Sequence, residues 1–304
     1  MLKFCSISTA SHLYKSKALA TSIHDFGAEL FLLLVDERAE SIAEKNCQIF
    51  DLSIFDGDST AQKIIGKYGN NKDKLRWALK PLFMLYLLKS NPKIIYVDND
   101  IFFLSNPTFL FDLLDEWNVL LTPHHYPSNP NRHQNWLEAN FRVGLYNAGF
   151  IAVNNKAINA LTWWAQCCLY NIKKAFWRGL FDDQKYLDLI PIEFDGVYVL
   201  KHPGCNLAGW NYNTYNIQRG KDGNVIINDK YQPVFIHFAD LSLQEFSDNN
   251  HLLYQEYCDY CKVVQRYNPS FTGKSTKFTL RNIKSYFYYT RWCTVRKIES
   301  KFNT

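Results

Sequence analysis

The sequence has no long apolar run, and we expect no leader of the kind that directs secretion. No stretch reaches the roughly 18 consecutive apolar residues that a membrane-spanning helix needs. The apolar run at the start, over residues 2–7, has only the length of a strand. We therefore expect a cytoplasmic protein, and we expect its eight cysteines to be free thiols because the cytosol keeps thiols reduced.

Two kinds of site also lack the residues that they need. Cys258 and Cys261 have the spacing of a zinc knuckle, but no second C-x-x-C or H-x-x-x-H pair accompanies them. Residues 8–12 follow the first expected strand and contain no glycine, which disfavours the glycine-rich phosphate loop usual in nucleotidyltransferases. The sequence shows no internal repeat and no low-complexity tract, so it indicates neither a solenoid nor a disordered chain.

Neither sign of charge dominates the body of the chain. The formal net charge is +5, but residues 277–304 alone hold seven basic residues and one acid, which leaves −1 for residues 1–276. Basic and aromatic residues interleave in that tail, as in an amphipathic helix at an anionic membrane surface. A helix packed on the body is the alternative. Nucleic-acid binding is disfavoured because no nucleic-acid motif accompanies the patch.

Apolar runs of strand length alternate with helical periods from the start of the chain. Residues 2–7, 29–35 and 47–52 are predicted strands, and residues 14–26 form a predicted helix between the first two. Strand–helix–strand units of this kind produce a parallel sheet with right-handed crossovers. The sequence therefore predicts an α/β domain over residues 1–270, followed by a basic tail over residues 271–304.

The pattern continues along the chain. Further strands are predicted over residues 93–97, 117–121, 149–153, 197–200 and 234–238, and further helices over residues 59–68, 74–80, 81–89, 108–114, 155–171 and 181–189. Pro81 is expected to begin a new helix, because proline interrupts a helix interior but suits its first turn. Residues 122–140 have no period and are predicted to form a long functional loop.

Small or acidic polar residues follow the predicted strands. Ser8 and Thr9 follow the first, Asp36 follows the second, and Asp98 and Asp100 follow the strand at residues 93–97. Ligands of open parallel sheets bind beyond the carboxyl ends of the strands. We therefore expect these residues to share one site.

Asp98-Asn99-Asp100 is the sharpest local signal. Side chains two apart in an extended segment point the same way, so the two carboxylates can share one divalent cation, which would bridge a diphosphate. The preceding run is apolar, and burying two carboxylates without a cation would be costly. Taken alone, His237 in the last strand is more typical of a hydrogen-bonded core residue. Lys80 precedes a proline, so its side chain is expected at an edge, where it either contacts phosphate or is solvated.

Six blocks carry a resemblance to a known family. They are ALKP at 78–81, IYVDNDI at 95–101, YNAGFIAV at 146–153, GLFDDQK at 179–185, HPGCNLAGWN at 202–211 and IHF at 236–238. In this order and spacing the chain, from about residue 4 to residue 240, resembles bacterial GT-A glycosyltransferases similar to the family 8 retaining enzymes. It looks closest to sugar transferases of polysaccharide and lipopolysaccharide synthesis. The resemblance implies a Rossmann-like nucleotide-diphospho-sugar transferase fold.

The resemblance also implies a role for each matching position. It places Mn²⁺ or Mg²⁺ on Asp98, Asp100 and His237, and the nucleotide beside Ser8, Thr9 and Asp36. Lys80 would face the donor sugar or phosphate, above a floor formed by Asn147 and Gly149. Asp183 and Gln184 would hydrogen-bond the transferred sugar, and the choice between Asp182 and Asp183 stays open. Asn206 and Trp210 would border the sugar or acceptor cleft.

The implied reaction moves a sugar from a nucleotide-diphosphate donor, expected to be a UDP-sugar, to a glycan or lipid-linked acceptor, with retention through front-face attack. The implied setting is cell-surface polysaccharide or lipopolysaccharide synthesis at the inner face of the cytoplasmic membrane. One block departs from the pattern. Residues 239–243 read ADLSL where family 8 enzymes commonly carry a Gly-x-x-Lys-Pro-Trp stretch that touches the diphosphate. A non-catalytic carbohydrate-binding or scaffold protein is the alternative.

Overall fold

A computed structural model describes residues 2–39 and 47–274 of the chain. The predicted basic tail at residues 277–304 lies outside the described residues. Within the described part, no helix combines the length and the apolar character needed to cross a membrane.

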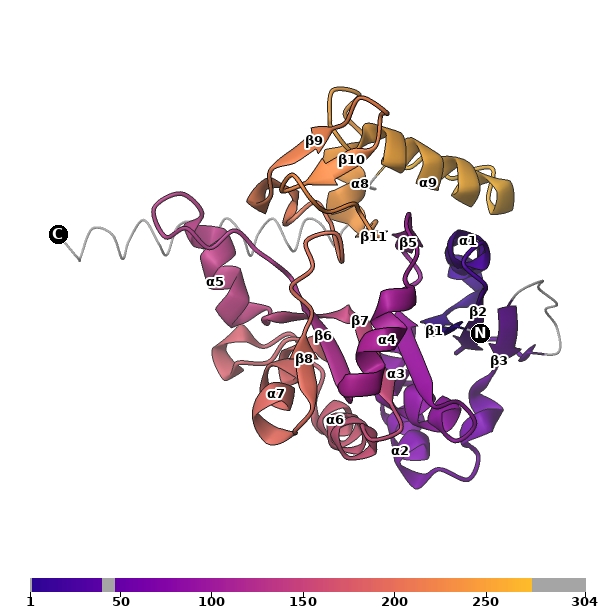
Figure 1. The fold of residues 1–304 in the computed structure, drawn as a ribbon. Coiled ribbons are helices and arrows are strands. Elements are labelled where there is room, and N and C mark those ends of the chain that lie inside the picture. The colour runs from indigo at the N-terminus through magenta and orange to yellow at the C-terminus, as the bar shows by residue number, and fades with distance from the viewer. Residues whose placement is uncertain (1, 40–46, 275–304) are drawn as a thin grey trace.

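A seven-stranded sheet forms the centre of the molecule (Figure 1), in the order β3-β2-β1-β4-β7-β6-β8. Its strands are β1 Leu2–Ser8, β2 Ala28–Leu34, β3 Cys47–Phe50, β4 Lys93–Val97, β6 Val119–Pro123, β7 Tyr146–Asn154 and β8 Val197–Val199. Strand β7 runs antiparallel to both β4 and β6, and all the other neighbours are parallel. The predicted α/β fold with a mostly parallel central sheet is confirmed.

Helices cover both faces of the sheet. Successive side chains of each strand point to opposite faces, so each strand packs against helices on both sides. Cys5 and Ile7 of β1 face the apolar cluster formed with α2 Ser59–Tyr68, α3 Lys72–Leu88 and α6 Ile158–Tyr170. Phe4 faces the opposite cluster, which includes residues of α1 Leu13–His24 and α4 Thr108–Glu116. The central strands are therefore buried on both sides, as their continuous apolar runs predict.

The C-terminal part adds a smaller layer beside this sheet (Figure 1). Strand β5 Ile101–Phe103 pairs antiparallel with β11 Phe235–His237, and β9 Ile217–Arg219 pairs with β10 Val225–Ile227. Helices α8 Asp240–Phe246 and α9 Tyr254–Tyr267 enclose a third apolar cluster with Phe238. The β5–β11 register sets His237 opposite Ile101, directly after the Asp98-Asn99-Asp100 segment.

The predicted helix break at Pro81 is wrong. Helix α3 runs without interruption through Pro81, which lies in its interior. Proline removes only one helical hydrogen bond, the one that would reach the carbonyl of Trp77. Because Ala78, Leu82 and Phe83 are buried on both sides of that position, tertiary packing outweighs this loss.

The predicted loop over residues 122–140 is partly wrong as well. Strand β6 extends to Pro123, and helix α5 Gln134–Arg142 occupies the second half of the segment. The expected helix over residues 181–189 is instead a 3-10 helix, Gln184–Leu189, which leads into the short helix α7 Ile190–Glu193. Only the stretch between β6 and α5 keeps the irregular form that the sequence predicts.

Candidate active site

The acidic segment after β4 holds its two carboxylates on the same side of the chain. The backbone N–H of Asp98 donates to the carbonyl of Gly149 over 2.9 Å, and that of Ile101 donates to the carbonyl of Asp98 over 3.1 Å. Asn99 is buried and points away, donating through Nδ2 to Ser8 Oγ over 2.9 Å. Asn99 therefore anchors this turn to the end of β1, while Asp98 and Asp100 face the site.

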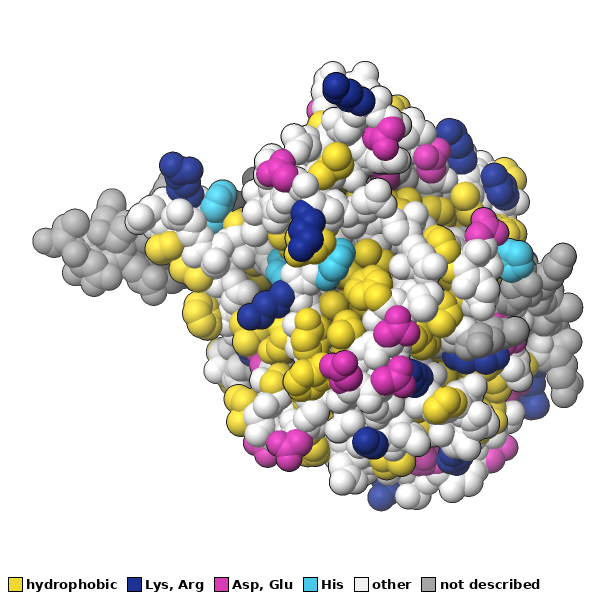
Figure 2. Space-filling view, in the orientation of Figure 1, with side chains coloured by type: hydrophobic (Ala, Val, Ile, Leu, Met, Phe, Trp, Pro, Cys, Tyr) yellow, Lys and Arg dark blue, Asp and Glu magenta, His cyan; other side chains and the backbone are white. Residues whose placement is uncertain are grey.

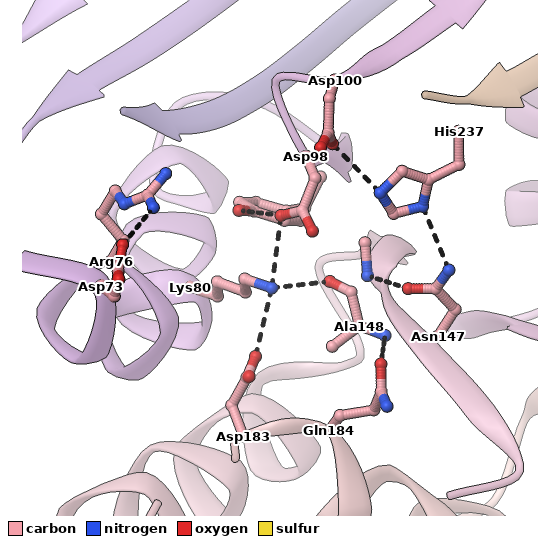
Figure 3. Close-up of polar contacts among 12 residues, drawn as sticks. Asp73, Arg76, Lys80, Asp98, Asp100, Asn147, Ala148, Asp183, Gln184 and His237 are labelled. Carbon is pink, nitrogen blue, oxygen red and sulfur yellow. Dashed lines mark hydrogen bonds and ion pairs between the residues drawn. The ribbon is translucent and has the colours of Figure 1, made fainter. Parts of the chain in front are cut away.

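His237 completes a three-residue cluster with the two carboxylates (Figure 3). Its Nε2 lies 3.0 Å from Asp100 Oδ1, and one ligand atom from each of Asp98, Asp100 and His237 lies within 4.8 Å of the others. Within the described residues this is the only such group of His, Cys, Asp or Glu side chains. Carboxylate oxygens with one imidazole suit a divalent cation such as Mn²⁺ or Mg²⁺.

Zinc has no comparable site in the described part of the chain. Cys258 and Cys261 lie in helix α9 as free thiols, and no cluster of potential ligands forms around them. Burial raises the pKa of Cys261 to about 11, which opposes the thiolate that zinc needs.

Gly149 lies directly beneath the cluster. A Cβ at this position would meet His237 Cε1 at 2.7 Å, Asn147 Oδ1 at 2.9 Å and Asp98 Oδ2 at 3.0 Å. Only glycine therefore allows β7 to pass this close. Asn147 Nδ2 lies 3.2 Å from His237 Nδ1, and Asn147 Oδ1 accepts the Gly149 N–H over 2.7 Å. These contacts fix the imidazole from below.

Asp100 and His237 shift each other's pKa values in opposite directions. Burial lowers the pKa of His237, but the Asp100 carboxylate outweighs it and leaves the pKa raised. Burial in turn raises the pKa of Asp100, but the His237 charge and hydrogen bond lower it well below its usual range. A divalent cation at this point would replace the histidine proton as the counter-charge.

Lys80 connects the acidic cluster to a third carboxylate (Figure 3). Its Nζ lies 3.3 Å from Asp98 Oδ1 and 3.2 Å from Asp183 Oδ2, and donates to the carbonyl of Ala148 over 3.0 Å. The side chain is 3% exposed. Burial lowers the pKa of Lys80, but the carboxylates of Asp183 and Asp98 outweigh burial and leave the pKa raised. The amine is therefore charged.

The expected position of Lys80 at an edge is therefore wrong. Since Pro81 does not end the helix, Lys80 lies inside α3, and its side chain points into the protein. An ammonium group has three protons to donate, and three partners already surround this one. The geometry suits a residue that holds Asp98 and Asp183 in place.

Asp183, and not Asp182, faces the cluster. Burial raises the pKa of Asp183 to about 6, although the Lys80 charge opposes this. Its Oδ2 lies 3.2 Å from Lys80 Nζ, and no other donor contacts it in the described structure. Asp182 has a left-handed backbone, with φ of 49°, and pairs with Lys174 over 3.2 Å.

Gln184 follows Asp183 and joins the same network. Its Oε1 accepts the backbone N–H of Ala148 over 3.2 Å, and its Nε2 donates to the carbonyl of Val143 over 3.3 Å. The side chain therefore links the start of the 3-10 helix to β7, beside Gly149.

The residues predicted to line a nucleotide pocket lie together at the ends of β1 and β2. Asp36 Oδ1 accepts the backbone N–H of Ala10 over 2.9 Å, and Asp36 Oδ2 lies 2.6 Å from Lys72 Nζ. Ser8 and Thr9 precede Ala10, and Thr9 Oγ1 lies 2.9 Å from His12 Nδ1. The site roles of Ser8, Thr9 and Asp36 stay predictions, but the structure brings the three into one place.

Asn206 and Trp210 form the wall on the other side of His237. Asn206 is buried with a left-handed backbone, φ 63°, and its Oδ1 accepts from Asn147 Nδ2 over 3.0 Å. Trp210 donates from Nε1 to the carbonyl of His124 over 3.1 Å. Its ring meets the His237 ring edge-on at 5.3 Å. Their roles at the sugar or acceptor cleft stay predictions.

Two residues of this site were not predicted from the sequence. Tyr96 donates to Asp98 Oδ1 over 2.8 Å, and its place two residues earlier in an extended segment was a usable signal. His124 holds Trp210 through its carbonyl, and no local pattern indicates this, because the contact depends on the path of an irregular segment.

Comparisons with known proteins place the fold. No family model matches the chain. It is 28% identical over 299 residues to the uncharacterized protein YfnF of Bacillus subtilis strain 168, covering 90% of this chain and 97% of that protein. The galactosyltransferase LgtC structure, bound to donor and acceptor sugar analogues, aligns with a TM-score of 0.52 at 13% identity, over 87% of this chain and 96% of LgtC.

The apo-form glycosyltransferase GlyE of Streptococcus pneumoniae TIGR4 aligns with a TM-score of 0.51 at 14% identity, over 88% of this chain and 62% of GlyE. At these identities the likeness concerns the backbone and not the individual site residues. This chain therefore has the GT-A fold seen in these glycosyltransferase structures.

Proposed function

We propose that this chain is a metal-dependent glycosyltransferase that moves a sugar from a nucleotide-diphosphate donor, a UDP-sugar, to a glycan or lipid-linked acceptor. One observation carries the proposal. In a GT-A fold, Asp98, Asp100 and His237 converge above Gly149, beside the buried Lys80–Asp183 pair. Each of these residues comes from a different part of the chain or from the end of a strand, as expected of a built site.

The residues present fit a divalent cation. Asp98, Asp100 and His237 would hold Mn²⁺ or Mg²⁺, and the missing side chain of Gly149 keeps the floor open. When bound, the ion neutralises the charge that develops on the departing nucleotide diphosphate. Lys80 supports this by fixing Asp98 against a second carboxylate, so that the ligand oxygens are positioned before the donor arrives.

Asp183 is suited to bind the transferred sugar. Among the described residues its Oδ2 contacts only the Lys80 ammonium, at 3.2 Å, so this oxygen keeps a lone pair that can accept from a sugar hydroxyl. Burial raises its pKa to about 6, which leaves it mostly ionised at neutral pH and able to accept that bond. Gln184 anchors the same segment to Ala148 and so sets the distance to the metal cluster.

We propose retention of configuration through attack from the face that the diphosphate leaves. The bond between the anomeric carbon and the acceptor oxygen forms as the bond to the phosphate oxygen breaks. The acceptor proton passes to the leaving phosphate. Lys80 restrains the Asp183 carboxylate, so that it serves as an acceptor for the sugar and not as a free nucleophile. The setting proposed is cell-surface polysaccharide or lipopolysaccharide synthesis at the inner face of the cytoplasmic membrane.

The experiment that tests this function is slow hydrolysis of a panel of nucleotide-sugars, with Mn²⁺ and then with EDTA. We expect cleavage of one donor, seen only with the metal, and its loss in Asp183→Asn. The exposed Asp112→Asn is the control and should keep wild-type turnover. Absence of cleavage for every donor, together with glycan binding by the intact protein, would instead support a non-catalytic carbohydrate-binding protein.

A further inference from the structure

The turn after α6 exposes three aromatic side chains close together in the sequence. Tyr170 is 62% exposed, Phe176 is 50% exposed and Trp177 is 85% exposed. A single exposed apolar residue is common on any protein surface. A tryptophan with most of its surface in water, next to a half-exposed phenylalanine, is not, and contiguous exposed apolar groups usually mark an interaction surface.

The tip of this turn is held in shape by the residues on either side. Ala175 and Leu180 exchange two backbone hydrogen bonds, of 2.9 and 3.1 Å, and Gly179 takes the left-handed backbone, φ 66°, that closes the turn. The Phe176 ring stacks on Phe181 at 5.5 Å. The exposure of Trp177 is therefore imposed by a structured turn.

Cationic side chains surround the aromatic tip. Arg178 donates to the Tyr170 hydroxyl over 3.0 Å, and Lys67 donates to the carbonyls of Leu169 and Tyr170 over 2.6 and 2.8 Å. Lys173 is exposed beside them. Within the described part of the chain, none of Lys67, Lys173 and Arg178 forms an ion pair with an acidic side chain.

Among the described residues, the acidic side chain paired with this turn is Asp182, and its charge is already neutralised. Asp182 pairs with Lys174 over 3.2 Å, and the Lys174 Nζ also lies over the Phe181 ring at 4.7 Å. The turn therefore presents aromatic rings and a net positive charge to the solvent. Aromatic rings with flanking Lys and Arg are the chemistry of protein segments that lie at the headgroups of anionic membranes.

We propose that residues 170–178 form a contact with an anionic lipid surface, with Phe176 and Trp177 inserted among the headgroups and Lys67, Lys173 and Arg178 against the lipid phosphates. This surface is separate from the basic tail at residues 277–304. A neutral sugar stacked on Trp177 would leave the positive charge of the turn uncompensated, whereas lipid phosphates would compensate it. Asp183 follows Trp177 by six positions in the chain, and the idea that this contact helps a lipid-linked acceptor reach the site rests on the proposed function.

The test is sedimentation of the full chain with vesicles of phosphatidylcholine alone and of phosphatidylcholine with 30% phosphatidylglycerol, without donor or metal. We expect binding to the anionic vesicles only, and a drop of about tenfold or more in affinity for Phe176→Ser/Trp177→Ser. Ile158→Ser/Leu252→Ser removes two exposed apolar side chains elsewhere and should bind as the wild type does. Lys173→Glu/Arg178→Glu should weaken binding and reduce its dependence on salt.

A second readout follows Trp177 itself. Brominated lipids should quench wild-type fluorescence more than that of Trp177→Phe, because insertion brings the indole to the acyl boundary. Equal vesicle binding by the double serine variant and the wild type, or equal binding to neutral and anionic vesicles, would overturn the proposal. Since no donor is present, failure here leaves the proposed reaction untouched.

Discussion

Asn99 and Gly149 shape the site without supplying chemistry to it. Asn99 is buried and ties the acidic segment to Ser8 of β1, so that the residues on either side of it face outward together. Gly149 allows β7 to pass under His237 and Asp98 with no side chain between. At the residue scale, the site depends on such neighbours as much as on its carboxylates.

Gly149→Ala should therefore disable the site. The added methyl would meet His237 Cε1 at 2.7 Å and Asp98 Oδ2 at 3.0 Å, so the ligands must move apart. We expect a fall of at least tenfold in metal affinity by isothermal titration, with about 1–3 kcal/mol lost in urea unfolding. Gly57→Ala is the matched control, because a Cβ there meets nothing within 4 Å. Unchanged metal binding by Gly149→Ala would contradict the geometry.

Lys80→Met should destabilise the protein by about 3–5 kcal/mol, because it leaves the Asp183 carboxylate buried without a counter-charge. Urea unfolding in EDTA measures this apart from metal binding. Adding Asp183→Asn should recover part of the loss, since the amide needs no counter-charge. A double variant no more stable than Lys80→Met would show that the two residues do not form an energetic pair.

The sequence was informative about which residues meet and less so about how. The strand ends bring Ser8, Asp36 and Asp98 together, as the α/β pattern predicts. The placement of Lys80 was predicted wrongly, because a local rule about proline was applied where helix packing decides the conformation. His124 could not be found at all, since its contact with Trp210 depends on tertiary structure.

Among the elements, β5 and β11 do the most to build the site. Their pairing sets His237 beside Asp100, and the backbone N–H of Phe238 donates to the carbonyl of Asp100 over 2.7 Å. The Phe238 ring stacks on Tyr260 of α9 at 4.1 Å. The C-terminal layer therefore supports His237, the third proposed metal ligand, from behind.

Phe238→Ala should lower both stability and metal affinity. The side chain is fully buried, so its loss should cost about 3–5 kcal/mol in urea unfolding and loosen β11 next to His237. Phe246→Ala removes an equally buried ring from the same cluster but lies farther along the chain from the ligand. We expect Phe246→Ala to destabilise the protein about as much as Phe238→Ala but to lose less metal affinity. Equal metal affinity in the two variants would show that β11 does not support the metal site.

Elements with strong apolar runs were predicted well, and those without were not. The strands β1, β2 and β4 lie within a residue or two of their predicted bounds. Helices α5, α8 and α9 were not predicted, because their apolar residues are sparse and they are stabilised by packing against other elements. The sequence pattern therefore describes the central sheet better than the layer that covers the site.

In the described part of the molecule, the clearest pH dependence comes from a few buried groups. Figure 2 shows acidic and basic side chains spread over one face, with neither sign gathered across it. Two neighbouring histidines are the clearest pH-dependent groups. Burial lowers the pKa of His124 to about 3 and that of His125 to about 4. Both stay neutral in the folded protein at neutral pH.

Stability should therefore fall as the pH drops below 6.5, the ordinary pKa of histidine. In that range the two histidines bind protons in the unfolded chain but not in the folded protein. The free energy of unfolding therefore falls by up to about 1.4 kcal/mol per pH unit for each histidine. Urea unfolding of wild type and His124→Asn at pH 7.0 and 5.5 measures the contribution of His124. Asp183 titrates in both proteins, so its effect cancels in the comparison. A variant with the wild-type slope would show that His124 is not the source.

The central claim is that Asp98, Asp100 and His237 form a metal site that works with a nucleotide. Isothermal titration of Mn²⁺ in the presence of saturating UDP tests this most directly. We predict one ion bound by the wild type, an affinity at least about a hundredfold lower in Asp100→Ala, and wild-type affinity in the exposed control Asp112→Ala. Absence of binding by the folded wild type, or equal binding by Asp100→Ala, would contradict the account.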